Sequence, residues 1–169
     1  MEDLVSRAVA RDVAAFSQLA RQHQSQVRGL LLRLTRGNHA LADDLAQETF
    51  LEAWRAIANF RGESQFATWL YRIAYSRFLM HARKRKPDEQ LDDWDAATPS
   101  SEGATHARID LERAMAKLSA PESAALTLCF ALGLSNTEAA DALDMPLGTL
   151  KSHVLRGREK LKTLLGGSP

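Results

Sequence analysis

The stretch LSAPESAALTLCFALGLSNTEAADALDMPLGTLKSHVLRGREKL, residues 118–161, carries the most specific fold signals in the chain. Ser119 with Glu122 fits the capping-box spacing, in which a serine and a glutamate satisfy free amide groups at a helix start. Ser135 with Glu138 repeats this pattern. A long apolar helix, a short helix, the turn DMP and a further helix are therefore predicted, an order typical of a helix-turn-helix.

The last helix of this segment is predicted to begin at Pro146, a residue suited to the first helical position. Its apolar side consists of Leu150, Val154, Gly157, Leu161 and Leu165. Five of the six charged residues from 146 to 162 are basic. Cations at DNA phosphates release counterions, and hydroxyl groups with Arg156 suit base edges, so this helix is a candidate for the major groove. A basic face that is merely solvated is the alternative.

Upstream of this segment, residues 87–105 have the composition of a linker. They open with Pro87 and are rich in Asp, Ser, Gly and Ala. Fully extended, they would reach roughly 65 Å, whereas one turn of DNA takes roughly 34–36 Å. The linker could therefore join two sites that lie more than one turn of DNA apart.

Charge is segregated along the chain, although its formal net charge is only +1. Residues 1–86 carry 14 basic against 8 acidic side chains, residues 87–104 none against 6, and residues 105–169 carry 8 against 7. Such blocks indicate separate modules. We expect a basic domain at 1–86, an acidic flexible linker at 87–105 and a helix-turn-helix domain at 106–169.

The basic domain is also predicted to be helical, and no part of the chain alternates like a β-strand. One helical period runs through Val5, Val9, Val13, Phe16 and Ala20. A second runs through Val27, Leu30, Leu31 and Leu34 and ends at TRGN, residues 35–38. A third, at about 40–58, would bury Leu45, Thr49, Ala53 and Ile57. The predicted fold is all-α, with two small helical domains.

The helix within FRGESQFATWLYRIAYSRF, residues 60–78, has more than one specialised face. Its apolar stripe consists of Phe66, Leu70, Ile73 and Ala74. Other faces carry a mixture of aromatic and cationic residues that suits unpaired bases and their backbone, namely Trp69, Arg72, Tyr75 and Arg77. Gly62 permits an unusual turn in the loop, where an extruded base could be held. Alternatively, Trp69 and Tyr75 are core residues of a helix packed on two sides.

Composition excludes several other classes of protein. The single cysteine, Cys129, allows no disulfide within one chain and favours a reducing compartment. No signal peptide and no run of roughly 18 apolar residues is found, so we expect a cytoplasmic protein. The five histidines lack metal-ligand spacing, and neither a phosphate loop nor a nucleophile motif is present, so we expect no metal, no cofactor and no enzymatic activity.

Residues 43–74, DDLAQETFLEAWRAIANFRGESQFATWLYRIA, resemble the promoter-melting domain of extracytoplasmic-function sigma factors of bacterial RNA polymerase. Residues 118–161 resemble the helix-turn-helix domain of the same family. The two motifs occur in the family's order on either side of an acidic linker. The resemblance implies a sigma factor that binds core RNA polymerase and recognises promoter DNA, the −35 element as duplex and the −10 element as a melted non-template strand.

The resemblance also assigns roles to residues. Bases of the −10 element would be captured by Asn59, Phe60, Arg61, Ser64, Thr68, Trp69 and Arg72, beside the aromatic and cationic Tyr75 and Arg77. The clamp coiled coil of the largest polymerase subunit would be bound by Asp43, Asp44, Gln47 and Glu48. The −35 element would be bound by Thr149, Lys151, Ser152, His153, Arg156 and Arg158. An anti-sigma factor is a further partner that the family implies, and it could hold the chain at the membrane.

Other interpretations remain open on the sequence. A stand-alone regulator would explain the helix-turn-helix but would leave the acidic face unused, and it would bind duplex DNA tightly without polymerase. The linker either threads a basic polymerase channel or is a solvated tether. Gly157 in mid-helix, with Ala139 and Ala140, predicts a soft recognition helix, thin packing and modest stability for residues 119–165 expressed alone.

Overall fold

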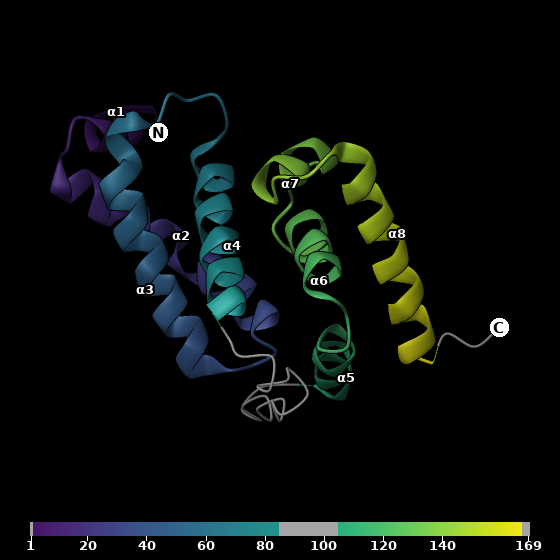
Figure 1. Ribbon diagram of the computed structural model, residues 1–169. Helices are drawn as coiled ribbons and strands as arrows, with labels where there is room; N and C mark the ends of the chain where they lie inside the picture. The colour runs from purple at the N-terminus through teal and green to yellow at the C-terminus, as the bar shows by residue number, and fades with distance from the viewer. Residues whose placement is uncertain (1, 85–104, 167–169) are drawn as a thin grey trace.

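The computed structural model describes residues 2–84 and 105–166, and every regular element in these ranges is a helix. The first range holds α1 (Glu2–Val9), α2 (Val13–Leu34), α3 (His39–Ala56), a 3-10 turn (Ile57–Asn59) and α4 (Phe66–Lys84) (Figure 1). The second holds α5 (His106–Met115), α6 (Ala120–Leu126) with a π-helical turn (Thr127–Ala131), α7 (Asn136–Ala142) and α8 (Leu147–Leu164). The all-α prediction is confirmed. Residues 87–104 of the predicted linker lie outside the described residues.

The N-terminal region differs from the prediction. The helical period expected to run through Val13 is interrupted just before that residue, between α1 and α2. Arg11 has a φ of 72°, and the Asp12 side chain caps α2 by accepting hydrogen bonds from the amides of Ala14 and Ala15 at 3.0 and 3.3 Å. The side chain of Val13 is 63% exposed. An aspartate that caps a helix start is a local signal that outweighs an apolar period running through it.

Helix starts in the second half agree closely with the sequence. Ser119 and Glu122 form a complete capping box, with hydrogen bonds of 3.3 and 3.0 Å. Ser135 and Glu138 form the second, at 3.1 and 2.9 Å. Helix α8 begins one residue later than predicted, at Leu147, because Pro146 is its N-cap and not its first helical residue. The helix-turn-helix prediction therefore holds, with a shift of one residue.

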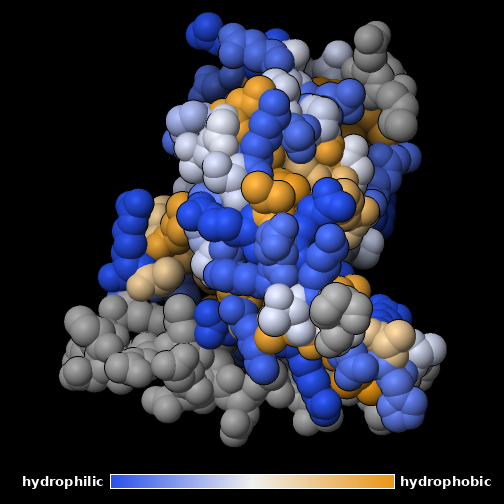
Figure 2. Space-filling model, turned by 90° about the vertical axis from the view of Figure 1, so that its right-hand side faces the viewer, coloured by the Kyte–Doolittle hydropathy of each residue, from blue (hydrophilic) through white to orange (hydrophobic). Residues whose placement is uncertain are grey.

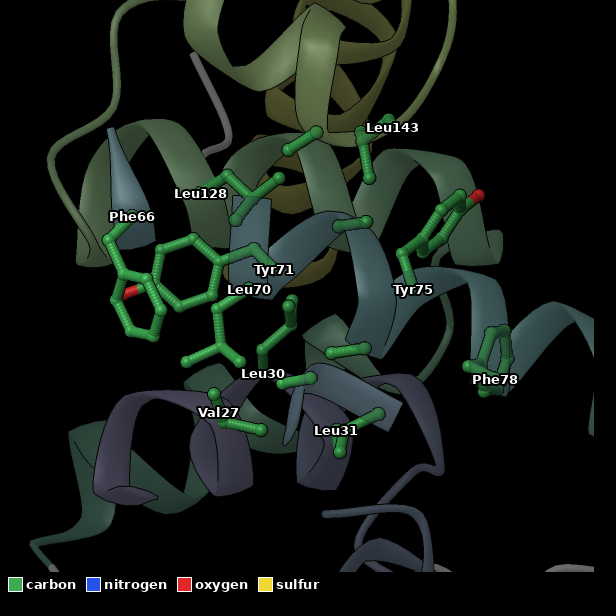
Figure 3. Packing of buried hydrophobic residues seen from close by; sticks show 14 of the residues in the cluster. Val27, Leu30, Leu31, Phe66, Leu70, Tyr71, Tyr75, Phe78, Leu128 and Leu143 are labelled. Atoms are coloured by element: carbon green, nitrogen blue, oxygen red, sulfur yellow. The ribbon is translucent and has the colours of Figure 1, made fainter. Parts of the chain in front are cut away.

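Helix α4 is packed on two sides and joins the halves of the chain. Figure 3 shows Leu30 of α2 on one side of α4 and Leu128 and Leu143 of the second half on the other, with Leu70 and Tyr71 between them. All five side chains are at least 96% buried and belong to one continuous core cluster. The two predicted domains are thus in direct contact through α4, which contacts α7.

Gly157, which predicted a soft recognition helix, also allows α8 to approach α6 closely. A Cβ at this position would lie 2.8 Å from Cδ1 of Leu126 and 3.2 Å from its Cγ. Ala139 and Ala140 are buried in the same continuous cluster, where α7 contacts α4. The small residues that predicted thin packing are therefore covered by other parts of the chain.

Candidate nucleic-acid interface

A cavity of about 880 Å³ lies between the loop that precedes α4 and the facing helix α7. Seven residues predicted to capture −10 bases line it: Asn59, Phe60, Arg61, Ser64, Thr68, Trp69 and Arg72. Gly62 in this loop has a φ of 74°, so the predicted unusual turn is confirmed. The loop and the first two turns of α4 thus bring most of the predicted set together.

Trp69 forms an aromatic wall of this cavity with two phenylalanines. Its ring centroid lies 5.1 Å from that of Phe60 and 5.7 Å from that of Phe66, with tilted planes. Phe66 is buried and edge-packed on His23, so the wall has a fixed support. Trp69 is half-buried and lines the cavity, which excludes the alternative that it is sealed in the core.

Tyr75 is wrongly predicted as part of an exposed face. It is 5% exposed, its ring lies 6.3 Å from that of Phe78, and burial raises the pKa of its hydroxyl. Thr68 is 2% exposed, although it belongs to the cavity lining. Arg77 pairs with Glu52 at 2.8 Å. Tyr75 lies where the second half packs on α4, which is why a face that looked free in the sequence is covered.

Arg72 reaches from α4 to the second half of the chain. Its Nη1 lies 3.2 Å from Oδ1 of Asp141, and its Nη2 lies 3.3 Å from Oδ1 of Asp144. Thr137, Glu138 and Asp141 of α7 also line the cavity opposite the loop. The sequence did not reveal this wall, because no local pattern links α4 with residues about 70 positions further along the chain.

The acidic residues predicted to bind the polymerase clamp share an exposed face of α3. All four are exposed, namely Asp43, Asp44, Gln47 and Glu48. Asp43 is neutralised in part by Arg28, whose Nε lies 2.6 Å from its Oδ1. The remaining carboxylates of Asp44 and Glu48 give this face its net negative charge.

Helix α8 presents its predicted basic side to solvent, at the edge of the molecule far from α1–α4 (Figure 1). Five of the predicted −35 residues are exposed: Thr149, Lys151, Ser152, Arg156 and Arg158. His153 is half-buried, and its Nδ1 lies 3.2 Å from Nη2 of Arg156. Figure 2 shows that the face around α8 is largely hydrophilic, with separate apolar patches. Such a face can enter a polar groove without burying charge against apolar surface.

Comparison with known proteins gives the family. A family model for sigma-70 region 2 matches residues 19–87, and one for sigma-70 region 4 matches residues 108–161. The RNA polymerase sigma-H factor of Pseudomonas aeruginosa is 33% identical over 97% of this chain and 93% of its own length. The ECF RNA polymerase sigma-E factor of Haemophilus influenzae is 34% identical over 94% of this chain and 92% of its own. The chain belongs to the extracytoplasmic-function group of sigma-70 factors.

Two solved structures have a similar fold over both halves of this sigma factor. The sigma factor RpoE of Bartonella quintana, solved with the anti-sigma factor NepR, matches with a TM-score of 0.78 and 30% identity, covering 93% of this chain and 100% of the other. CnrH, solved with the cytosolic domain of CnrY, matches with a TM-score of 0.72 and 25% identity, covering 98% and 97%. As a member of this group, the protein directs transcription initiation.

Over residues 2–84 and 105–166, no group of three or more His, Cys, Asp or Glu side chains is placed to hold a metal ion. None of the helices in those ranges is both long and apolar enough to span a membrane.

Proposed function

We propose that this sigma factor captures bases of the melted −10 strand in the cavity beside Trp69. The observation that carries the proposal is that a single cavity is lined by seven of the residues predicted for this role. Stacking of an unpaired base on an aromatic ring stabilises binding by about 1–3 kcal/mol. Arg61 and Arg72 would contact the strand phosphates, and the turn at Gly62 leaves backbone room for an extruded base.

The −35 element would be bound as duplex by the exposed side of α8. Thr149 and Ser152 lie near its N-terminal end, which in helix-turn-helix proteins enters the major groove. Arg156 would read a base edge, while Lys151 and Arg158 would neutralise phosphates. The exposure of these side chains in the free chain supports this assignment.

Core RNA polymerase would be bound through the acidic face of α3, by contact with the clamp coiled coil of the largest subunit. Asp44 and Glu48 are exposed and have no ion pair among the described residues, so they are available to a basic partner surface. Exposed charges of this kind govern association rate and salt dependence more than the lifetime of a complex. Polymerase assembly should therefore weaken as ionic strength rises.

An anti-sigma factor is the further partner that we propose. The Bartonella quintana RpoE structure contains the anti-sigma factor NepR, and the CnrH structure contains the cytosolic domain of CnrY. Similarity to these two proteins over nearly the whole chain, and the anti-sigma factor bound to the first of them, support a protein regulator here. Binding to such a regulator would determine when this factor is released to the polymerase.

Run-off transcription with core polymerase and candidate promoters tests these roles. Trp69→Ala should impair strand opening while polymerase assembly is retained, because only base stacking is removed. Glu48→Lys should weaken assembly, since it places a cation on the face that meets a basic surface. Unaltered transcript from both variants would contradict the assignment of sites.

Matched controls separate these effects from loss of folding. Val13→Ala is the control for Trp69→Ala, because it also truncates an accessible apolar side chain to alanine. Asp110→Lys is the control for Glu48→Lys, because it makes the same charge change at an exposed position of α5. Both controls should transcribe like the unaltered chain. Trp69→Phe keeps a stacking surface and should restore most of the strand opening that Trp69→Ala loses.

A further inference from the structure

The corner between α1 and α2 places an arginine where the backbone favours glycine. The Arg11 amide donates to the Ala8 carbonyl at 2.9 Å, and the Asp12 amide donates to the Arg7 carbonyl at 3.0 Å. These two hydrogen bonds form the Schellman arrangement that ends many helices, in which the left-handed residue is usually glycine. Arg11 occupies that position with a φ of 72°, a conformation that is costly for a residue with a Cβ.

The side chain of Arg11 reaches α3 from this corner. Its Nη1 donates to the main-chain carbonyl of Trp54, and its Cζ lies 3.9 Å from the centroid of the Trp54 ring. The guanidinium group thus holds both the backbone and the indole of one residue. Trp54 also contacts the buried Phe16 of α2, with 5.2 Å between the ring centroids. The corner, α2 and α3 therefore meet at Trp54.

Trp54 lies in the last turn of α3, just before the helix changes into the 3-10 turn Ile57–Asn59. The last carbonyls of a helix have no partner within it and carry partial negative charge. A cation that donates a hydrogen bond to one of them stabilises the helix end. Arg11 supplies such a cation from outside α3 and so helps to fix where this helix ends.

The chain that leaves this helix end enters the −10 cavity. Asn59 ends the 3-10 turn, and both Asn59 and Phe60 line the cavity. The Phe60 amide donates to the carbonyl of the fully buried Ile57 at 3.0 Å. Helix α1 contacts the 3-10 turn at the end of α3 from which the loop runs to α4 (Figure 1). A change in the direction of this end would therefore move Phe60 against Trp69.

Arg11 itself lies outside the cavity. It is not among the residues that line the cavity, and its guanidinium group is engaged by Trp54. The corner that carries it is braced from within, because Asp12 caps α2 and lies 2.8 Å, through its Oδ2, from Nη2 of Arg7. Arg11 is thus placed to act on strand capture through the loop and not by contact with the strand.

We propose that Arg11 is a positioning residue for the loop that captures −10 bases, because it fixes the end of α3 from which that loop departs. The inference rests on the strand-binding role proposed above for the cavity. It gives a reason for an arginine where glycine would be less strained, since the side chain is needed at α3. Loss of that side chain should release the 3-10 turn and Phe60 while α4 stays folded.

Arg11→Gly removes the side chain and suits the positive φ, so relief of backbone strain offsets the lost contact with Trp54. The urea midpoint of the full chain should therefore stay close to that of the unaltered chain. Hydrogen exchange should rise in peptides that cover residues 57–65. In protein labelled with 5-fluorotryptophan, the fluorine NMR signal of Trp69, assigned with Trp69→Phe, should shift although Arg11 lies outside the cavity that Trp69 lines.

Arg36→Gly is the matched control for this substitution. Arg36 also has a positive φ, of 56°, and it follows the C-terminal end of α2, whereas Arg11 precedes the N-terminal end of that helix. The control therefore makes the same change in a similar backbone conformation at the other end of α2. Exchange in residues 57–65 and the Trp69 signal should not change.

Strand opening is measured with core polymerase on an active promoter, as permanganate reactivity of the −10 thymines. Arg11→Gly should lower this reactivity roughly threefold to tenfold, less than Trp69→Ala, because a stacking surface is misplaced and not removed. Protection of the −35 region should be kept. The salt slope of promoter binding should also be unchanged, whereas loss of a direct phosphate contact would reduce it by about 1.

These readouts separate failure of the inference from failure of the proposed function. Unchanged exchange and an unchanged Trp69 signal would overturn the positioning role and leave the −10 assignment intact. A released loop with normal opening would also overturn it, if Trp69→Ala impairs opening. If neither variant impairs opening, the −10 assignment fails and the inference falls with it. Effects shared by Arg36→Gly, or a reduced salt slope, would contradict action through the loop.

Discussion

Gly157 shows how one missing side chain determines a helix contact. Because a Cβ there would lie 2.8 Å from Leu126, Gly157→Val should force α8 away from α6 and lower the free energy of unfolding by about 1–3 kcal/mol. Gly148→Ala is the matched control on the same helix, since nothing lies within 4 Å of its added Cβ. Urea unfolding should show the control to be as stable as the unaltered chain or more so. Equal stability of Gly157→Val would mean that the close approach is unimportant.

Glu122 links the same two helices electrostatically. Burial alone would raise its pKa, but hydrogen bonds from Lys160 at 2.8 Å and from the Ser119 amide outweigh it, so the pKa is lowered from 4.5. A lowered native pKa stabilises the fold above the unfolded value and loses that contribution as pH falls through the native value. Glu122→Gln keeps the capping geometry and should cost about 1 kcal/mol at pH 7. The difference from the unaltered chain should vanish in acid, and a gap that persists below the native pKa would contradict this account.

At the scale of elements, α8 and α4 differ in how far the sequence predicted them. The capping boxes and the turn before α8 are local signals, and the exposed side of α8 needed no knowledge of other helices. The residues of the loop before α4 were correctly predicted to lie with its first turns, because they are adjacent to the helix in the sequence. Tyr75 was misplaced because it is buried where the second half of the chain packs on α4, and that half begins about 30 positions further along the sequence. The broken helix at Asp12 was predictable from its cap, which the longer apolar period concealed.

Helix α8 allows a test that distinguishes base contacts from phosphate contacts. Arg156→Ala should weaken binding to an active promoter by about 1–3 kcal/mol and relax preference at one −35 position. Lys151→Ala should weaken binding to all sequences alike and reduce the salt slope by about 1. Lys117→Ala, an exposed lysine outside α8, should change neither. Polymerase-dependent promoter binding at several salt concentrations gives both quantities, and identical behaviour of the three variants would refute the −35 assignment.

At the scale of the whole molecule, the sequence did not predict the contact between the two halves of the chain. Arg72 is 69 and 72 residues from its partners Asp141 and Asp144, and Arg33 is 79 residues from Glu112. Charge segregation correctly indicated two modules, but charge blocks carry no information about docking. A linker composition likewise says that two modules can separate and not that they meet. These contacts depend on how the two helical bundles pack on one another, which no local sequence pattern encodes.

Docking gives a physical reason for the modest stability predicted for residues 119–165 on their own. That fragment lacks α4, which covers Leu128 and Leu143, and it lacks Met115 and Leu118, which pack with Leu126. Exposed apolar surface costs about 25 cal/mol per Å². Circular dichroism should therefore show a lower and broader melt for the fragment than for the intact chain. A fragment melt as sharp and as high as that of the whole protein would contradict this expectation.

The central claim is that Trp69 and its cavity hold the separated −10 strand, and permanganate reactivity of promoter thymines tests it most directly. Holoenzyme carrying the unaltered chain should make the −10 thymines reactive on an active promoter. With Trp69→Ala, the holoenzyme should still protect the −35 region while those thymines stay unreactive. Equal thymine reactivity with both proteins would contradict the claim.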